Sequence, residues 1–483
     1  MKFPLLGKLG AIALVGLMLM MVLMRIEGLV QERQARGQEA VRGVERSHAA
    51  SQAVVGPLLQ RVCTEEWDTV AGTGAERVVT NNKREFALVQ APDTLSVDGR
   101  TRAEPLWRGL FKINAYNGHF IVAADFGSLA ALQPRAEHEG SRLRCAAPVV
   151  LLALSDVRGL RVATLSADGQ GVAVESGTTS GAYAHGLHAT LGAARADGDA
   201  AARPLAVRLE LDLVGTTQLG WVPAAGTTHW TLNADWPSPS FGGQFLPAER
   251  HVRPDGFTST WTLSALATGA PGDVVRGLSL CTPASATASY ADVADDATAQ
   301  DGKCLALMNV AFIDPVNPYV LSDRAIKYDL LFIVLTFIAV GLVEVLSGRR
   351  VHPVQYLLVG LALSMFFLLL LSLSEHFAFE KSYAAAAGAC AALLAFYASS
   401  MLGRLLSGVL FGLGIGLLYG LLYVLLQMEQ NALVIGSVGL FAALAAVMAL
   451  TRHIDWYALF ARLRANTGGP ETARAAPAHG SGE

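Results

Sequence analysis

Residues Ser322–Phe379 read SDRAIKYDLLFIVLTFIAVGLVEVLSGRRVHPVQYLLVGLALSMFFLLLLSLSEHFAF and contain two long apolar runs separated by Arg349-Arg350. Each run is about as long as the roughly 20-residue helix that crosses a bilayer. The sequence before this stretch is mostly of water-soluble character, and the sequence after it is mostly apolar. The stretch therefore marks the start of a membrane domain.

The composition agrees with a membrane protein that carries a large soluble part. The chain has 483 residues, of which 52% are hydrophobic and 16% charged, whereas soluble domains have about 25% charged residues. We predict a polytopic α-helical membrane protein with a large, mainly β periplasmic domain inserted between its first and second transmembrane helices. The predicted division is an anchor at 1–27, a helical stalk at 28–57, a β-rich domain at 58–321, a helical bundle at 322–457 and a disordered cytoplasmic tail at 458–483.

The N-terminal segment resembles a secretion signal that is not removed. Lys2 and Lys8 precede or flank the apolar run Leu9–Met24, and no small-residue cleavage pattern follows it. We interpret the run as an uncleaved signal anchor; a cleaved signal peptide is the alternative. The charged, helix-forming residues that follow predict a continuation of this helix as a stalk, ended by Gly56-Pro57.

The C-terminal part predicts five further spans, which makes six with the anchor. The short loops on one side of these spans are basic, at Arg349-Arg350 and Arg404, and those on the other side are mostly acidic. The positive-inside rule then places both termini in the cytoplasm and the soluble domain outside. The predicted spans are 328–346, 354–373, 383–402, 405–426 and 432–450.

The soluble region shows the period-two alternation of strands. Residues 205–213 alternate apolar and mostly polar side chains, as do the residues around Trp230 and Trp261. We predict a sandwich-like β domain. Tryptophans on strands also suit a sugar-stacking platform, but core packing is the commoner use. The four residues in question are Trp221, Trp230, Trp236 and Trp261.

Four cysteines lie in this region. In an exported domain, a Cys281–Cys304 disulfide would close a loop rich in Ala, Ser, Thr and Asp. A Cys63–Cys145 disulfide is the second hypothesis. A zinc site is the alternative, although the cysteine spacings do not match those of zinc sites.

A glycine repeat predicts how two membrane helices pack. Gly408, Gly412, Gly416 and Gly420 are spaced by four residues, so we expect them on one helix face, where small residues allow close approach in lipid. The preceding span offers small partners, and we expect replacement of Gly416 by Ile to disrupt the bundle. The expected partners are Ala384, Gly388 and Ala392.

Ionisable residues near the membrane are candidate functional sites. Each lies close to a predicted interface, where anchoring is the ordinary role, and Arg349 or Arg350 is the expected partner of Glu344. Glu375 and His376 could also form an acid–base pair. The candidates are Glu375, His376, Asp329, Glu344, Arg452 and Asp455. We find no motif for a catalytic, cofactor or metal site, and no basic patch for nucleic acid.

Several stretches resemble the CreD family of bacterial inner-membrane proteins, which are linked to cell-envelope integrity and colicin tolerance. The likeness runs in order over nearly the whole chain, and the segment Cys281–Asn309 looks longer than in the family. The matching stretches are Val55–Leu58, Ala234–Arg250, Ser322–Tyr328, His352–His376 and Thr451–Ala458.

The resemblance implies an inner-membrane protein with six helices and a periplasmic domain. It also implies control by a two-component system, a role in envelope integrity and, in some relatives, a link to the β-lactam response. It carries no catalytic residues. We therefore expect a non-enzymatic protein without cofactors, in contact with membrane lipids, whose periplasmic domain binds an envelope component or protein. The alternative is a lipid or small-molecule transporter, or a membrane-embedded enzyme acting on an envelope precursor.

Overall fold

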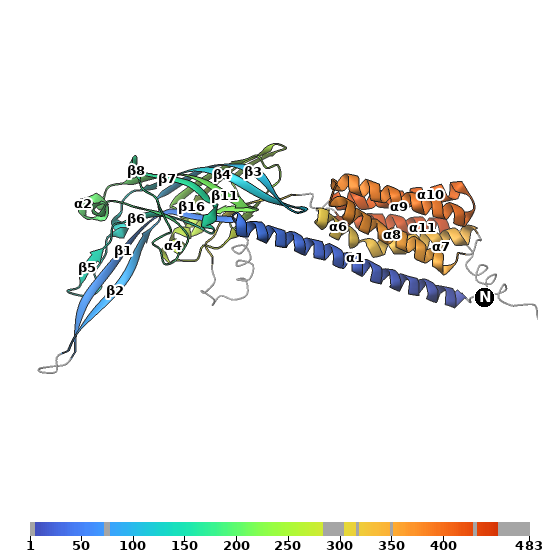
Figure 1. Cartoon of the computed structure of the whole chain (residues 1–483), viewed down its shortest axis with the longest axis horizontal. Coiled ribbons are helices and arrows are strands. Elements are labelled where there is room, and N and C mark those ends of the chain that lie inside the picture. Colours follow the sequence, from blue (N-terminus) through green and yellow to red (C-terminus); the bar gives the residue numbers. More distant parts are fainter. Residues whose placement is uncertain are drawn as a thin grey trace, which may run out of the picture. The chain divides into compact units, whose positions relative to one another are not determined.

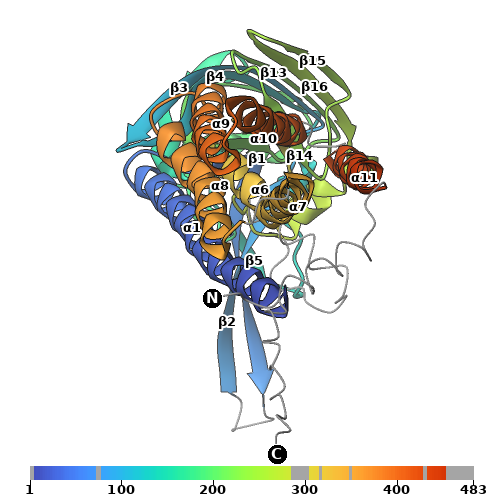
Figure 2. The same ribbon diagram turned by 90° about the vertical axis from the view of Figure 1, so that its right-hand side faces the viewer.

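The computed structural model describes residues 5–71, 78–283, 304–314, 318–347, 351–427 and 432–452. The chain forms two compact units (Figures 1 and 2). The membrane unit comprises Met1–Arg36 and Val316–Glu483, and the β unit comprises Gly37–Pro315. The tail predicted at 458–483 lies outside the described residues.

The membrane unit is built of helices. Four described helices are long and apolar enough to cross a bilayer: Gly10–Ser47, Pro353–Ser374, Phe379–Leu402 and Leu405–Gln427. Tyr319–Ile326 and Asp329–Glu344 meet at a 46° bend and together pass the same test. The helices are α1 (Leu5–Ser47), α6 (Pro318–Ile326), α7 (Asp329–Ser347), α8 (Pro353–Ser374), α9 (Phe379–Leu402), α10 (Leu405–Gln427) and α11 (Ala432–Thr451). The helices α7 to α11 lie on the five predicted spans, and their ends differ from the predicted ones by a few residues.

Local sequence signals set the ends of these helices. α8 begins at Pro353, and His352 caps it: its side chain accepts from the N–H of Val354, and the Gln355 side chain accepts from the N–H of His352. This reciprocal capping satisfies backbone donors that a helix start leaves free, and proline fits the first helical position. α9 ends at Leu402, and Gly403 follows it with a positive φ of 62°, the conformation that glycine adopts most easily at a helix C-terminus.

The predicted boundaries of the β domain require correction at both ends. α1 ends at Ser47, whose hydroxyl donates to the carbonyls of Gly43 and Val44. The chain is already a strand from Gln52, where β1 (Gln52–Ala71) pairs with β12 (Gln218–Trp221). Gly56-Pro57 therefore lies inside β1 and does not end the helix. At the other end, Ser322 lies within α6, which begins at Pro318.

The β unit is a sandwich of two sheets. The order in the nine-stranded sheet is β14-β17-β12-β1-β6-β10-β9, with β2 and β5 also pairing with β1, and the order in the eight-stranded sheet is β15-β16-β13-β3-β4-β11-β7-β8. One core cluster draws residues from both sheets, as expected for sheets packed face to face. The strands are β1 (Gln52–Ala71), β2 (Val78–Gln90), β3 (Thr94–Arg108), β4 (Phe111–Phe126), β5 (Arg142–Cys145), β6 (Val149–Leu154), β7 (Leu160–Ala167), β8 (Gln170–Val172), β9 (Glu175–Ser176), β10 (Gly186–Thr190), β11 (Leu205–Thr216), β12 (Gln218–Trp221), β13 (Thr227–Ala234), β14 (Pro239–Gly243), β15 (Glu249–Arg253), β16 (Gly256–Ser264) and β17 (Met308–Phe312).

The tryptophans singled out in the sequence are core residues. Trp221, Trp230 and Trp261 are fully buried, and Trp236 is 7% exposed. The rings of Trp230 and Trp261 stack with centroids 4.3 Å apart. Because these rings face the space between the sheets, they form no platform at the surface.

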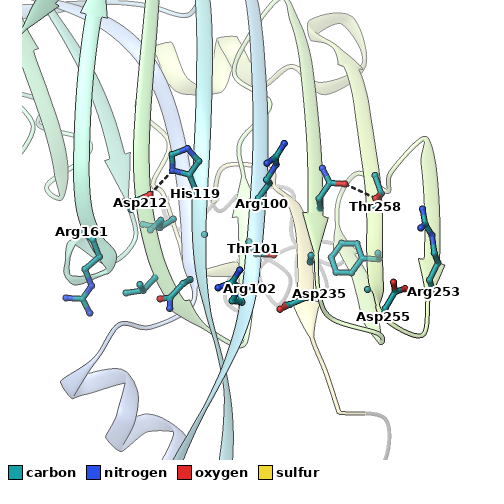
Figure 3. A pocket seen from close by; sticks show the side chains of 18 residues that line it. Arg100, Thr101, Arg102, His119, Arg161, Asp212, Asp235, Arg253, Asp255 and Thr258 are labelled. Carbon is teal, nitrogen blue, oxygen red and sulfur yellow. Dashed lines mark hydrogen bonds and ion pairs between the residues drawn. The ribbon is translucent and has the colours of Figure 1, made fainter.

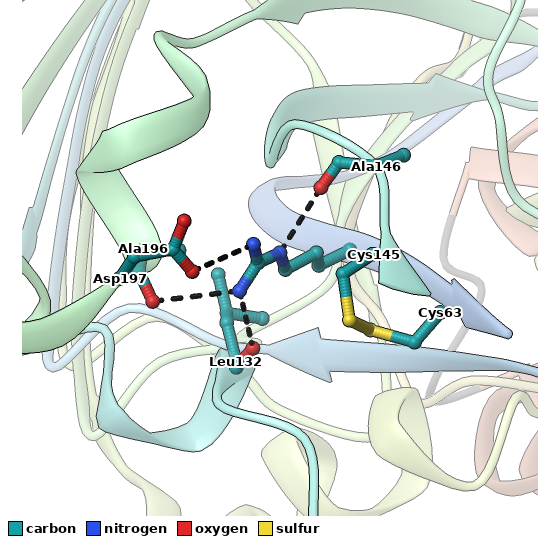
Figure 4. The surroundings of a disulfide bond; sticks show 7 residues. Cys63, Leu132, Cys145, Ala146, Ala196 and Asp197 are labelled. Carbon is teal, nitrogen blue, oxygen red and sulfur yellow. Dashed lines mark hydrogen bonds and ion pairs between the residues drawn. A yellow bond between two sulfur atoms is a disulfide. The ribbon is translucent and has the colours of Figure 1, made fainter. Parts of the chain in front are cut away.

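The structure contains disulfides between Cys63 and Cys145 and between Cys281 and Cys304. The first joins directly paired residues of β1 and β5. Figure 4 shows the carbonyl groups that gather beside it. The buried Arg61 donates to the carbonyl of Ala146 and to the Asp197 carboxylate, so this end of the sheet is held by a covalent bond and by a buried arginine.

Candidate functional site

At one end of the membrane unit, α1 is joined to α7 and α8 by Glu344. This residue forms an ion pair with Lys8, and its second oxygen accepts from the Tyr356 hydroxyl at 3.1 Å. Arg349 and Arg350, the partners expected from the sequence, lie outside the described residues. Among the described residues, Glu344 pairs with Lys8, which lies on the N-terminal helix α1.

At the opposite end of α8, Glu375 joins the same helix α1. Its carboxylate lies 3.3 Å from Arg33, and its side chain is only 10% exposed. The Gln34 side chain donates to the Tyr319 carbonyl at 3.2 Å. The stretch of α1 from Lys8 to Arg33 rises by about 38 Å, slightly more than the roughly 30 Å hydrocarbon core. The two ion pairs are therefore spaced to lie just outside that core.

Two of the candidate residues that the structure describes, Glu375 and His376, are adjacent in sequence but point apart. His376 is exposed, whereas Glu375 is turned towards Arg33, so the two do not form an acid–base pair here. Asp329 begins α7 and Arg452 follows α11. Asp455 lies outside the described residues.

The glycine repeat packs against α9 over half of its length only. A Cβ at Gly412 would lie 2.5 Å from the Cβ of Ala395, and one at Gly408 would lie 2.5 Å from the backbone nitrogen of Ser399. A Cβ at Gly416 or Gly420 would meet nothing within 4 Å. A spacing of four advances the face by about 40° per step on a helix of 3.6 residues per turn, so the later glycines turn away.

The predicted partners of these glycines on α9 were also wrong. Ala384, Gly388 and Ala392 are exposed. The helix pair was correct, but the face of α9 that meets α10 carries Ala391, Ala395 and Ser399.

In the β unit, a shallow groove of about 810 Å³ lies on the outer face of the eight-stranded sheet, away from the core (Figure 3). One row of cross-strand neighbours crosses it, and two pairs in that row are hydrogen-bonded. Thr258 donates to Asn233 at 2.8 Å, and His119 contacts Asp212 at 2.7 Å. The row consists of Thr258, Asn233, Arg100, His119 and Asp212.

Four exposed arginines line this groove: Arg100 and Arg102 on β3, Arg161 on β7 and Arg253 on β15. Within the described ranges, none of their guanidinium groups forms an ion pair or hydrogen bond. Of the three aspartates in the lining, Asp212 contacts His119, and Asp235 accepts from the N–H of Ala103 at 2.6 Å. The groove therefore offers arginine donors that neighbouring acids do not occupy.

Sequence reasoning missed this groove. Arg100 and Arg102 flank the buried Thr101, and this alternation could have placed both on an exposed strand face. Nothing in the sequence places Arg161 or Arg253 beside them, because that depends on the strand order. Among the described residues, no cluster of three or more His, Cys, Asp or Glu side chains is suited to a metal ion.

Comparison with known families supplies the wider context. The family model described as "Inner membrane protein CreD" matches residues 4–457. The chain belongs to the CreD family. It is 31% identical over 459 residues to the inner membrane protein CreD of Escherichia coli (strain K12), and the match covers 95% of each chain. The resemblance noted in the sequence is thus confirmed, and the chain is a multi-pass inner-membrane protein.

Solved structures add nothing to this assignment. The M1 zinc metallopeptidase of Deinococcus radiodurans matches with 15% identity and a TM-score of 0.19, over 36% of this chain and 38% of that one. The same enzyme with a bound Tyr-Ser-Ala substrate gives a TM-score of 0.18. Likenesses this weak carry no argument about fold or activity.

Helix α8 lies within one of the stretches that resemble the CreD family. The CreD-like stretch His352–His376 coincides with this helix and its cap. It supplies both Tyr356, which contacts Glu344, and Glu375, which pairs with Arg33. This CreD-like stretch therefore contributes a residue to the contacts of α1 near each end of α8.

Proposed function

We propose that this protein supports envelope integrity without catalysis, under two-component control, and that its β unit binds an acidic envelope component in the periplasm. The observation that carries this proposal is the groove with its four arginines. Family membership supports the setting, since the chain is an inner-membrane protein.

The proposed orientation has the β unit in the periplasm, between the first two transmembrane segments, and both termini in the cytoplasm. Its support is the distribution of basic residues. Lys8 and Glu344 lie together at one end of the membrane unit, and the turn between α9 and α10 at Arg404 belongs to the same end by the alternation of the helices. Basic residues favour the cytoplasmic side.

The chemistry of the groove favours a ligand with phosphate or carboxylate groups. The planar guanidinium group donates two parallel hydrogen bonds to such anions. Arg100 and Arg102 point to the same side of β3, because residues two apart on a strand share a face. The groove volume of about 810 Å³ is within the usual range for small-molecule sites.

The test is in-cell crosslinking from the groove. A photoreactive amino acid replaces the exposed Asn117, which lies in the groove, and captured material is identified by mass spectrometry. We expect an acidic envelope component, with capture at least about tenfold lower in the double variant Arg100→Gln/Arg102→Gln, since losing two charged hydrogen bonds costs more than about 1.4 kcal/mol. Arg208→Gln is the matched control, because Arg208 is exposed on β11 but does not line the groove. Equal capture by the protein with neither change, by the double variant and by Arg208→Gln would contradict the proposal.

The transporter or enzyme alternative has less support. It would use the membrane unit, and Glu375 with His376 were its candidate residues. The Glu375 carboxylate is engaged with Arg33. A change in envelope phenotype on mutating His376 alone would revive this alternative.

A further inference from the structure

The arginines of the groove are spread across the eight-stranded sheet at three positions. Arg100 and Arg102 form a central pair on β3, whereas Arg161 lies on β7 and Arg253 on β15. In the strand order β15-β16-β13-β3-β4-β11-β7, three strand-to-strand steps separate β3 from either end, which is about 14 Å on each side. Figure 3 shows this order, with Arg161 at one end and Arg253 at the other. The end arginines are therefore placed for separate acid groups, not for one shared anion.

Local features of the sheet put both end arginines on its outer face. Arg253 is the last residue of β15 and is paired with Gly256, so its neighbour on that face has no side chain. Arg161 lies where the pairing of β7 with β11 shifts register, between Asp212 and Leu213. An irregularity of this kind redirects a side chain, and Arg161 lines the groove together with Arg253.

Carboxylates lie between the three arginine positions. Asp212 on β11 lies between the β7 end and the central pair, and it contacts His119 at 2.7 Å. Asp235 follows β13 and lies between the central pair and the β15 end, and it accepts from the N–H of Ala103 at 2.6 Å. Figure 3 shows Asp255 between Asp235 and the β15 end. The charge across the groove therefore changes sign from one strand group to the next.

This alternation disfavours a ligand that carries an acid group on every unit. Such a chain would place some of its charges against Asp212 and Asp235, and like charges that face each other are costly. A ligand with hydroxyl groups between its acid groups avoids this cost, because a hydroxyl donates to a carboxylate. Among the described residues, the Asn117 oxygen and the Asn233 nitrogen have no hydrogen bond, so they add an acceptor and a donor for such hydroxyls.

We propose that the groove binds a linear acidic glycan that lies across the strands. Its acid groups contact the three arginine positions, and the hydroxyl groups of the neutral sugars between them donate to Asp212 and Asp235. The inference rests on the proposed function, because it specifies the acidic component that the groove binds. The two end positions are about 29 Å apart, so the affinity should depend on the length of the chain.

The test compares three probes on the full chain in nanodiscs of phosphatidylcholine, a lipid without net charge. A hyaluronan decasaccharide and a hyaluronan tetrasaccharide carry a carboxylate on every second sugar. A glutamate decapeptide carries one on every residue and reaches about 33 Å when extended, so it can span the groove. We expect the decasaccharide to bind about tenfold more tightly than either other probe, because only it forms charged hydrogen bonds at the ends without repulsion between them. Isothermal titration calorimetry measures the affinities.

Substitutions at the ends distinguish a bound chain from a single bound acid group. Arg161→Gln and Arg253→Gln should each weaken the decasaccharide by about threefold to tenfold. Neither should change the affinity of the tetrasaccharide, because the shorter chain is held at the central pair. The double variant Arg100→Gln/Arg102→Gln should weaken both oligosaccharides. Arg208→Gln is the matched control outside the groove and should weaken neither.

Equal affinities of the decasaccharide and either other probe would overturn the inference, and so would absence of decasaccharide binding. If the central double variant still weakens binding of the probes, the groove binds acid groups and the proposed function stands. The natural ligand gives a second readout, since material captured in cells from position Asn117 should contain repeating sugar units. Capture of an acidic compound without sugars would overturn the inference alone, whereas absence of any arginine-dependent capture would overturn the proposed function as well.

Discussion

At the scale of single residues, Glu65 is a buried carboxylate that organises a loop. It lies on β1 and is fully buried. One of its oxygens accepts from the N–H groups of Glu137 and His138 and from the Ser141 hydroxyl. Led by the backbone N–H of His138, these bonds lower the pKa of Glu65 from 4.5 to about 2, although burial opposes the shift. The carboxylate therefore stays charged inside the fold.

We predict that Glu65 makes stability depend on pH in acid. A carboxyl whose pKa falls on folding stabilises the fold above its unfolded pKa, and this contribution is lost as the pH falls from about 4.5 towards 2. Glu65→Gln should lower the melting temperature at pH 7 and reduce its change across that range. Tryptophan fluorescence during heating provides the measurement. The control is Glu66→Gln, which removes the same charge from the other face of β1; identical acid profiles for both variants would contradict the prediction.

At the scale of elements, the contact between α9 and α10 depends on two of the four glycines. We predict that Gly412→Ile lowers stability in detergent by about 1–3 kcal/mol or more, because the new side chain would overlap Ala395. Gly416→Ile should change it by less than about 0.5 kcal/mol, since that position is open. Thermal unfolding of both variants measures the difference. If Gly416→Ile is the more damaging change, the helix face assigned here is wrong.

The two disulfides constrain loops of different length. The separations are 82 residues for Cys63–Cys145 and 23 for Cys281–Cys304. The chain-entropy estimate gives about 4.5 kcal/mol for the longer loop and about 3.4 kcal/mol for the shorter. We predict that the paired alanine replacement of Cys63 and Cys145 lowers the melting temperature more than that of Cys281 and Cys304.

The redox state of the cysteines can be checked by mass. Alkylation of the denatured chain without reductant should label Cys390 alone, which is the free cysteine of the structure. Alkylation after reduction should label all five cysteines. Five labels under both conditions would refute both disulfides.

At the scale of the whole molecule, the ion pairs of Lys8 and Arg33 bound a stretch of α1 that is long enough to cross a bilayer, as the proposed topology requires. We predict that alkaline phosphatase, which is active only in the periplasm, is active when fused after Gln90. Green fluorescent protein fused after Thr451 should fluoresce, as expected on the cytoplasmic side. The positive-inside distribution is the physical reason. The opposite pattern of the two reporters would invert the proposed orientation.

The sequence alone determined the membrane helices and the β character of the soluble part. Apolar runs of bilayer length are local signals, and so is the alternation of strands such as Leu205–Thr216. The family likeness could also be read from short polar stretches. The end of α1 could not be predicted from the sequence, because strand pairing at Gln52 overrides the local turn signal at Gly56-Pro57.

Only the tertiary structure decided which distant residues meet. Arg100 and Arg253 line one groove because three pairings place β3, β13, β16 and β15 in order. Glu344 meets Lys8 for a similar reason, since helix packing brings together residues from opposite ends of the chain. Periodicity shows which face of an element is buried, but the neighbours of that face are set by packing over the whole chain. The sequence therefore determined the class and the membrane setting of this protein, and the fold decided its groove and its ion pairs.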